Sequence, residues 1–293
     1  MRLTFLSVLF VPFVLHAEPV SLFDGKTIEG WDFDPAMWRV EDGVITGGST
    51  TEKIKKNDFI STKKSYQNFE LKLKIKVSGD PKTGMLNSGI QIRSVRADGG
   101  AMSGYQIDCG AGWFGKIYDE HRRNKVIWAP TPEQQAALDK AIDVFGWNEY
   151  RIRAEGPRIQ TWINGVHCID YTEEDKNIAL DGLIGPQVHS GGVCLVQVKD
   201  VTIEELPPTP NAPTWESLGG VDAARKKVSS SKSQVPGNVK PETRNQKRDI
   251  SYNNVQGTAL TAEEQLKKFH LPEGYEIELI QRSPAARSGS GTY

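Results

Sequence analysis

The chain has 293 residues, of which 36 are Lys or Arg and 37 are Asp or Glu, so its formal net charge at pH 7 is −1. A balance so close to neutral, with the two signs mixed along the chain, argues against a general polyanion binder, and nucleic acid is not an expected partner. The length allows one sizeable domain with additional segments. The cysteines, Cys109, Cys168 and Cys194, have no metal-ligand spacing and are odd in number. We expect them to be buried, unpaired thiols.

The N-terminus has the layout of a secretory signal peptide over residues 1–17. Arg2 precedes an apolar run over residues 3–15, and the small residue Ala17 suits a cleavage site. The apolar run is too short for a stable bilayer span, and no later stretch is long enough. We therefore expect a secreted or periplasmic protein with no transmembrane helix after cleavage. An uncleaved N-terminal anchor is the alternative.

Short strands separated by turns dominate residues 18–206. Residues 69–77 and 148–154 alternate apolar and charged side chains with a period of two, which is typical of a strand with one solvated face. Residues 193–203 have the composition of a long final strand. This density of strands predicts an all-β fold with two packed sheets.

Two local elements can be predicted within this region. The dipeptide Asn164-Gly165 suits the positive φ angles of a tight hairpin turn between two apolar runs. One short helix is expected after Thr131, which can act as its N-cap, with Pro132 at the first helical position and Gly146 as its limit. The helix is interpreted as an insertion that packs on the sandwich.

The chain changes character after Leu206. Residues 207–262 are rich in Pro, Lys and polar residues and poor in large apolar ones, so they are predicted to be a disordered linker. Residues 263–293 resemble the beginning of a propeller-type, sugar-dehydrogenase-like domain that stops before a sheet can form. We expect either a fragment of a longer protein, with a dehydrogenase-like domain or partner at this end, or a vestigial tail.

Polar residues on strand-like segments are the first candidates for a site. In NSGIQIR, residues 87–93, Gln91 and Arg93 are expected on one face and Ile90 and Ile92 on the other. Amides and a guanidinium can hydrogen-bond sugar hydroxyls, so Asn87, Gln91 and Arg93 are candidate binding residues. The alternative interpretation is an ordinary solvated sheet face.

A second segment adds an acid next to an amide. Gln106 and Asp108 are predicted to share a face on the strand beside residues 87–93, with Tyr105 and Ile107 on the opposite face. Gln187 and His189 alternate in the same way further along the chain, and histidine can exchange protons near neutral pH.

Three other residues have weaker support. Asp119 and Glu120 are candidate ligands of a divalent metal, with a charged loop of surface ion pairs as the alternative. Trp113 is a candidate for stacking on a sugar ring, although sandwich cores use tryptophan in the same way.

Four runs together resemble a known family. LFDGKTIEGW at 22–31 is the most distinctive, and WRVEDGVI at 38–45, NSGIQIR at 87–93 and GPQVH at 185–189 support it. They resemble the 3-keto-disaccharide hydrolase family, described as 3-keto-glucoside 1,2-lyase and 3-keto-2-hydroxy-glucal hydratase and formerly a domain of unknown function. The resemblance covers roughly residues 20–206.

This resemblance implies a jelly-roll β-sandwich of the concanavalin A-like lectin and glucanase type, acting on a 3-keto-glucoside. The family pattern has glutamate at the position of Gln106, glutamine at that of Asp108 and leucine at that of Pro186, so this chain departs from it at three positions. The exchange keeps a carboxyl group on the same strand face but moves it by two residues. Carry-over of a catalytic acid is therefore in doubt.

The family chemistry is elimination of the glycosidic substituent followed by hydration of the glucal, which needs a base, an oxyanion stabiliser and an acid. We expect Asp108 or His189 to be the base. Arg93, with Asn87 or a divalent ion, is expected at the ketone oxygen, and Asp119 or Glu120 is held in reserve as acid or metal ligand. Two rival functions are a non-catalytic carbohydrate-binding module and a conventional glycoside hydrolase, which would need two carboxylates flanking the bond.

Overall fold

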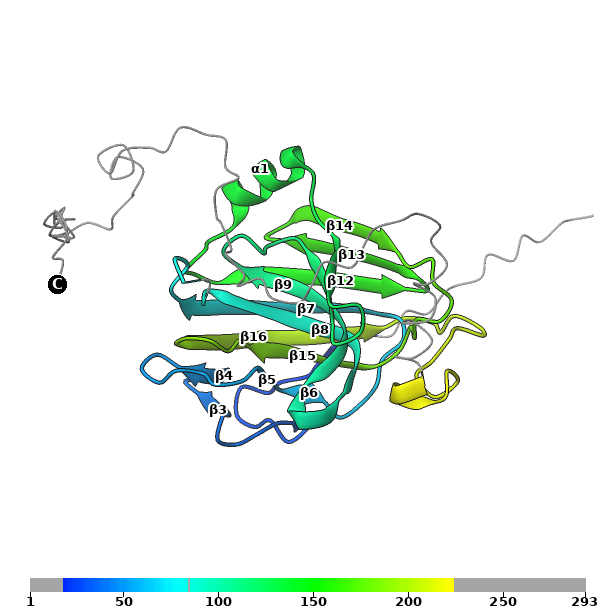
Figure 1. Cartoon of the computed structure of the whole chain (residues 1–293), viewed down its shortest axis with the longest axis horizontal. Coiled ribbons are helices and arrows are strands. Elements are labelled where there is room, and N and C mark those ends of the chain that lie inside the picture. The colour runs from blue at the N-terminus through cyan, green and yellow to red at the C-terminus, as the bar shows by residue number, and fades with distance from the viewer. Residues whose placement is uncertain (1–17, 84, 224–293) are drawn as a thin grey trace, which may run out of the picture. The chain divides into compact units, whose positions relative to one another are not determined.

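The structure is a computed structural model that describes residues 18–83 and 85–223. The predicted signal peptide over residues 1–17, most of the predicted linker and the predicted dehydrogenase-like segment over residues 263–293 lie outside the described residues. Two antiparallel sheets are stacked as a sandwich (Figure 1), so the predicted all-β jelly-roll fold of the concanavalin A-like type is confirmed. In the described part of the chain, no helix has the length and apolar character needed to span a membrane.

The first sheet has eight strands in the order β14-β13-β12-β7-β16-β4-β3, with β1 paired to β16. Their bounds are β1 Val20–Ser21, β3 Trp38–Glu41, β4 Val44–Ser49, β7 Phe69–Gly79, β12 Asn148–Glu155, β13 Arg158–Ile163, β14 Val166–Thr172 and β16 Cys194–Glu205. The alternation predicted for β7 and β12 places Leu71, Leu73 and Ile152 in the core and the charged residues between them on the opposite face.

The second sheet has six strands in the order β11-β10-β9-β8-β15-β5. Their bounds are β5 Asp58–Phe59, β8 Asn87–Arg96, β9 Met102–Gly110, β10 Ile117–Glu120, β11 Lys125–Trp128 and β15 Leu183–Val188. A separate pair joins β2, Trp31–Asp32, to β6, Ser61–Thr62. The core lies between the two large sheets, where side chains such as Ile90, Ile92 and Ile107 of the second sheet join those of β7 and β12.

The local predictions for the hairpin and the helix are confirmed. Asn164 and Gly165 have φ angles of 48° and 81° between β13 and β14. Helix α1, Pro132–Ala141, begins after Thr131, whose side chain forms a reciprocal capping box with Gln134. Three cysteines are free and buried, as expected from their apolar strand contexts: Cys109, Cys168 and Cys194.

The side chain of Arg93 joins the second sheet to the first. The sequence had predicted that it would lie on the same strand face as Gln91. The residue has φ 49°, and the pairing of β8 with β9 shifts between Ile92 and Val95. Its buried guanidinium donates to the carbonyl oxygens of Gln67, at 2.6 and 2.9 Å, and of Gly156, at 2.7 Å. Because of the bulge, Arg93 does not share a face with Gln91.

A second buried charged cluster joins the sheets through Glu173, which follows β14. Tyr105 on β9 and Tyr171 on β14 donate hydroxyl hydrogen bonds to its carboxylate, at 2.8 and 2.9 Å. Arg123 bridges the same carboxylate, at 2.8 Å, to Asp119 on β10. These bonds satisfy charges that would be costly to bury alone.

The sandwich extends past the boundary expected at residue 206. Trp215 and Leu218 are buried, and the indole nitrogen of Trp215 donates to the carbonyl oxygen of Arg93 at 3.2 Å. Asn68 donates to the carbonyl oxygen of Pro207 at 2.7 Å. The first part of the predicted linker therefore packs on the domain. This part of the chain is mostly polar, but a few large apolar side chains in it are buried and pack it on the domain.

Replacing Arg93 tests how strongly it ties the sheets. We expect Arg93→Met to lower the free energy of unfolding by about 3 kcal/mol or more, because it leaves buried carbonyl acceptors without donors. Arg158→Met is the control, since Arg158 pairs with Asp170 at the exposed surface and its removal should change stability little. Urea denaturation measures both. Equal losses in the two variants would contradict the role of Arg93.

Candidate functional site

Polar side chains line the face of β9, β8 and β15 that points away from the core. Gln91 lies directly opposite Gln106, and Asp108 lies opposite Gly89. Gln187 occupies the same face of β15, since its neighbours Pro186 and Val188 alternate with it and Val188 is in the core. We call Gln91, Gln106, Asp108 and Gln187 the polar row. All four side chains are buried, with at most 4% of any residue exposed.

Hydrogen bonds run along the polar row in one direction. Ser94 donates to the amide oxygen of Gln91 at 2.6 Å, and the amide nitrogen of Gln91 donates to the amide oxygen of Gln106 at 2.8 Å. Gln106 then donates to Oδ1 of Asp108 at 3.0 Å. Each amide is oriented by the preceding donor, so the carboxyl group of Asp108 is held at the end of a fixed chain.

Gly89 makes room for this chain. A Cβ atom at this position would lie 2.3 Å from Cγ of Gln106, which is closer than packed atoms approach. The side chain of Gln106 therefore leans over the backbone of β8 to reach both Gln91 and Asp108. The chain of hydrogen bonds from Ser94 to Asp108, which we call the relay, therefore requires glycine at position 89.

Two members of the polar row have polar atoms without partners. Oδ2 of Asp108 and both polar side-chain atoms of Gln187, Oε1 and Nε2, are buried and have no hydrogen-bond partner among residues 18–83 and 85–223. Buried polar groups in folded proteins are nearly always paired, so such atoms on one sheet face are sites where a ligand can supply the missing bonds. The polar row can thus both donate to and accept from a polar molecule.

Burial sets the protonation of the acids on this face. It raises the pKa of Asp108 well above its ordinary value, and the hydrogen bond from Gln106 opposes this only in part. On β10, burial, with a smaller contribution from the Asp119 carboxylate, raises the pKa of Glu120 to about 7. Asp108 therefore keeps its proton to higher pH than an ordinary aspartate, and Oδ2 is the oxygen that can carry it because Oδ1 accepts from Gln106.

His189 lies at the end of β15, one residue after Val188. Its Nδ1 lies 2.7 Å from the carbonyl oxygen of Ser190, which can only accept, so Nδ1 carries the proton and Nε2 has the free lone pair. Burial lowers the pKa of His189, with the Ser190 bond opposing it. The ring is therefore neutral at pH 7 and can act as a base.

The structure separates the two metal candidates. Asp119 and Glu120 are consecutive on β10 and point to opposite faces. Asp119 is fully buried, and its two oxygens accept from Arg122, at 2.8 Å, and from Arg123. Among residues 18–83 and 85–223, no three His, Cys, Asp or Glu side chains are grouped to hold a metal ion. The described donors do not fit a divalent ion.

The remaining predicted residues lie near one end of the polar row. Asn87 is the first residue of β8 and pairs with Gly110, the last residue of β9. Trp113 follows in the turn after β9, and Nζ of Lys116 lies 5.0 Å from the centroid of its ring, so one candidate stacking face already has a cation near it. Arg93 stands apart, as its hydrogen bonds go to the first sheet.

Sequence reasoning missed Ser94 and did not predict the raised pKa of Glu120. Ser94 joins the relay only because the bulge at Arg93 brings it to the face of Gln91, and a single serine carries no such signal. Glu120 was proposed only as a reserve acid or metal ligand. Its elevated pKa depends on burial by the folded chain, which a single sequence does not reveal.

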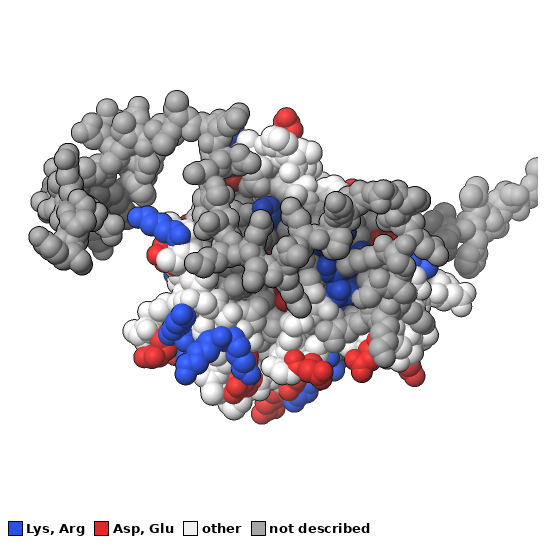
Figure 2. All heavy atoms as spheres, in the orientation of Figure 1, with Lys and Arg blue, Asp and Glu red and all other residues white. Residues whose placement is uncertain are grey.

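On the face shown in Figure 2, the visible described side chains form no large patch of one charge. Where described side chains are visible, basic and acidic residues lie interspersed around its rim. This agrees with the near-zero net charge of the whole chain.

Comparisons with solved structures give low similarity. A candidate glycosyl hydrolase from Parabacteroides distasonis is 22% identical over 64% of this chain and 94% of its own, with a TM-score of 0.48. A second from the same organism is 19% identical over 64% of this chain and 100% of its own, with a TM-score of 0.45. The carbohydrate-binding module CBM66 from Bacillus subtilis is 20% identical over 60% and 96%, with a TM-score of 0.43. A search of curated proteins gives no match.

A family model matches residues 18–204, which is most of the described chain and includes nearly all of the two-sheet sandwich. The matched residues include the polar row, the residues that form the hydrogen bonds along it, and His189. The function is accordingly that of a carbohydrate-active protein, and the chain belongs to the family of 3-keto-alpha-glucoside-1,2-lyase-like domains.

Proposed function

We propose that this protein is an exported enzyme that cleaves 3-keto-glucosides by elimination and then hydrates the product, for a net hydrolysis. The observation that carries the proposal is the carboxyl group of Asp108, which is buried, held at Oδ1 by Gln106 and unpartnered at Oδ2. Membership of the family and the apolar run near the N-terminus support the substrate class and the export.

A protonated carboxyl group suits the first step of this reaction. The ketone at C3 acidifies the C2 proton, and loss of that proton places negative charge on the ketone oxygen. A neutral acid that donates a hydrogen bond to this oxygen stabilises the enolate, as buried protonated aspartates do elsewhere. We assign this role to Asp108. Asp108 takes the role that the sequence had suggested for Arg93, because the Arg93 guanidinium already donates to the carbonyl oxygens of Gln67 and Gly156.

His189 is assigned as the base. Its Nε2 takes the C2 proton, and the electron pair of the C2–H bond moves into the enolate. The enolate then re-forms the ketone and a C1=C2 double bond while the substituent on C1 leaves with its bonding electrons and takes from His189 Nε2 the proton that came from C2. Water adds across the double bond at C1 and C2 in the second step. Gln187 and Asn87 are assigned to hydrogen bonds with the sugar hydroxyls.

Turnover of 3-keto-glucosides by the purified protein is the direct test. We expect release of the C1 substituent by the wild-type protein, a loss of about 10- to 100-fold in kcat for Asp108→Asn, and a loss of about 1,000-fold for Asp108→Ala. The asparagine amide still donates a hydrogen bond, whereas alanine does not.

Asp200→Asn makes the same chemical change at an exposed position of β16 and should leave kcat unchanged. Equal activity of the wild-type protein and Asp108→Ala would refute the assignment. Sugar binding without turnover would support a binding module instead, and turnover of unoxidised glucosides would support a conventional glycoside hydrolase.

The pH dependence of kcat/KM should report both assigned groups. Activity is expected to rise with pH through an apparent pKa below about 6.5, where His189 becomes neutral, and to fall at higher pH where Asp108 ionises. The residual activity of His189→Ala should lack the rising limb, and that of Asp108→Asn should lack the falling limb. A profile that keeps its rising limb in His189→Ala would exclude this histidine as the base.

Glu120 should lower stability as the pH rises. Its pKa is about 7 in the folded protein, above the ordinary value of 4.5, so the folded state binds more protons between these values. Stability should therefore fall from about pH 4.5 to pH 7 on account of this group. We expect Glu120→Gln to be more stable than the wild type at pH 8 and similar to it at pH 4. Thermal unfolding at both values tests this, and an equal difference at both would contradict it.

A further inference from the structure

Asn57 lies beside the chain that carries His189, at the edge of the second sheet. β5 begins at Asp58, which pairs with Val188, the last residue of β15. The two chains continue from this pair, one into Asn57 and the other into His189. A hydrogen bond joins them there, because the backbone nitrogen of Ser190 donates to Oδ1 of Asn57 at 2.8 Å. A residue far away in the sequence is thus in direct contact with the residue next to the assigned base.

Ser190 connects the side chains of Asn57 and His189. Its carbonyl oxygen lies 2.7 Å from Nδ1 of His189, while its N–H is held by Asn57. A carbonyl oxygen can only accept, so Nδ1 carries the hydrogen. A backbone N–H can only donate, so the amide of Asn57 turns its oxygen to Ser190. The amide therefore holds Ser190, and Ser190 holds the imidazole ring.

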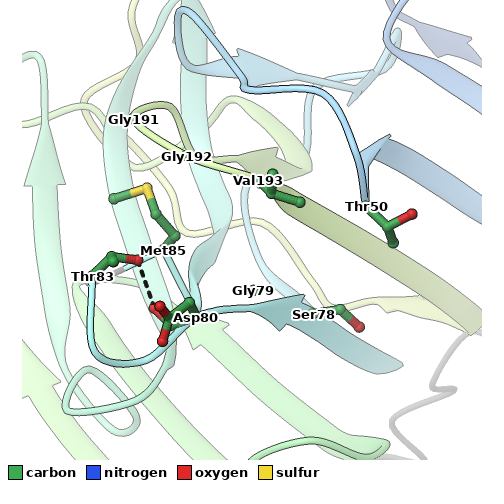
Figure 3. Close-up of a pocket in the computed structure, with 9 residues that line it drawn as sticks. All are labelled: Thr50, Ser78, Gly79, Asp80, Thr83, Met85, Gly191, Gly192 and Val193. Atoms are coloured by element: carbon green, nitrogen blue, oxygen red, sulfur yellow. Dashed lines mark hydrogen bonds between the residues drawn. The ribbon is translucent and has the colours of Figure 1, made fainter. Parts of the chain in front are cut away.

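The loop after Ser190 depends on tertiary contacts for its conformation. Gly191 has a φ angle of 110°, which glycine adopts readily, so the backbone here has little preference of its own. Gly191 donates to the carbonyl oxygen of Ile54 at 2.9 Å, and Ile54 donates to that of Gly192 at 2.8 Å. Met85 packs against both glycines (Figure 3), and a Cβ atom on Gly192 would lie 2.3 Å from its Cγ. These contacts fix the loop beyond Ser190.

The bond from Ser190 to Asn57 is the side-chain contribution to this anchoring. Within residues 18–83 and 85–223, it is the one hydrogen bond of the Asn57 side chain. Asn57 is half-buried, and its neighbours Lys55 and Lys56 are exposed, so this segment is not part of the core. The partner of its amide is therefore the residue that accepts from His189, and no other described group.

The position of Ser190 matters because the two nitrogens of a neutral imidazole have opposite roles. Which of them carries the hydrogen is set by the hydrogen bonds that the ring makes. With Nδ1–H directed to Ser190, Nε2 of His189 keeps its lone pair and can take a proton. If Ser190 turned away, the hydrogen could move to Nε2, and a ring in that form could not act as a base there.

We propose that Asn57 is a positioning residue for His189. It holds the Ser190 backbone so that the ring keeps its hydrogen on Nδ1 and presents the lone pair of Nε2 to the sugar. The inference rests on the proposed function, in which Nε2 removes the C2 proton. Asn57 acts through Ser190 and has no assigned contact with the substrate.

Nitrogen NMR of the imidazole ring tests this role without any turnover. At pH 8, the wild-type protein is compared with Asn57→Ala, which lacks the acceptor, and with Asn57→Asp, whose carboxylate keeps it. Asn177→Ala is the matched control, because it removes a half-buried asparagine whose side chain bonds only Asp175. The signals of His189 are identified by their absence from His189→Gln. Asn57→Ala should fold, since the residue lies outside the core.

We expect the hydrogen on Nδ1 of His189 in the wild-type protein, in Asn57→Asp and in Asn177→Ala. In Asn57→Ala, about half of the molecules or more should carry it on Nε2. Turnover of a 3-keto-glucoside should follow the same order, with kcat about tenfold lower in Asn57→Ala, lowered about threefold at most in Asn57→Asp, and unchanged in Asn177→Ala.

Hydrogen on Nε2 in the wild-type protein, or an unchanged ring in Asn57→Ala, would overturn the role of Asn57. Equal losses of kcat in Asn57→Ala and Asn57→Asp would overturn it as well, because the second variant keeps the acceptor. The expected change of the ring, in a protein that turns over no 3-keto-glucoside, would support the positioning of His189 and refute the proposed function.

Discussion

The buried guanidinium of Arg93 is the interaction on which the arrangement of this site depends. The positive φ angle at Arg93 turns its side chain from the polar face of β8 towards the first sheet, where it bonds Gln67 and Gly156. The same turn brings Ser94 to Gln91. One bulge thus connects the two sheets and starts the chain of amides that ends at Asp108. A β-bulge beside a functional site often re-aims side chains in this way.

The buried, unpaired polar atoms of the polar row lower the stability of the folded domain. Within the part of the chain that the structure describes, Asp108 is buried with one oxygen unpaired and Gln187 has no partner for either polar atom. Each such group costs on the order of 1–3 kcal/mol relative to a paired one. Glu120 adds a further cost above pH 4.5, because burial opposes its ionisation. Stabilising bonds elsewhere, such as those among Arg123, Asp119 and Glu173, offset these costs in a domain of this size.

Much of the fold could be predicted from the sequence because alternation and turn chemistry are local properties. The strands at 69–79 and 148–155, the Asn164-Gly165 turn and the helix cap at Thr131 follow from patterns a few residues long. The shared face of Gln106 and Asp108 follows for the same reason. The bulge at Arg93 could not be predicted, since arginine has no special preference for positive φ and only tertiary hydrogen bonds hold it there. Separation of Asp119 from Glu120 was implicit in the strand period, but the segment was not recognised as a strand.

The departure of this chain from its family pattern has a structural explanation. Gln106 and Asp108 stand where the family resemblance implies glutamate and glutamine, and the two side chains are hydrogen-bonded at 3.0 Å. The pair still joins an amide to a carboxyl group, but the carboxyl group now lies at the far end of the relay, nearer to Gly110 and its partner Asn87. There Gln106 donates to Oδ1, and Oδ2 is left without a partner among the described residues. A carboxyl group in the place of Gln106 would instead have to accept from Gln91 on one oxygen, and residue 108 would lose its acid. This chain therefore has a buried acid on the same strand face, at position 108 in place of position 106.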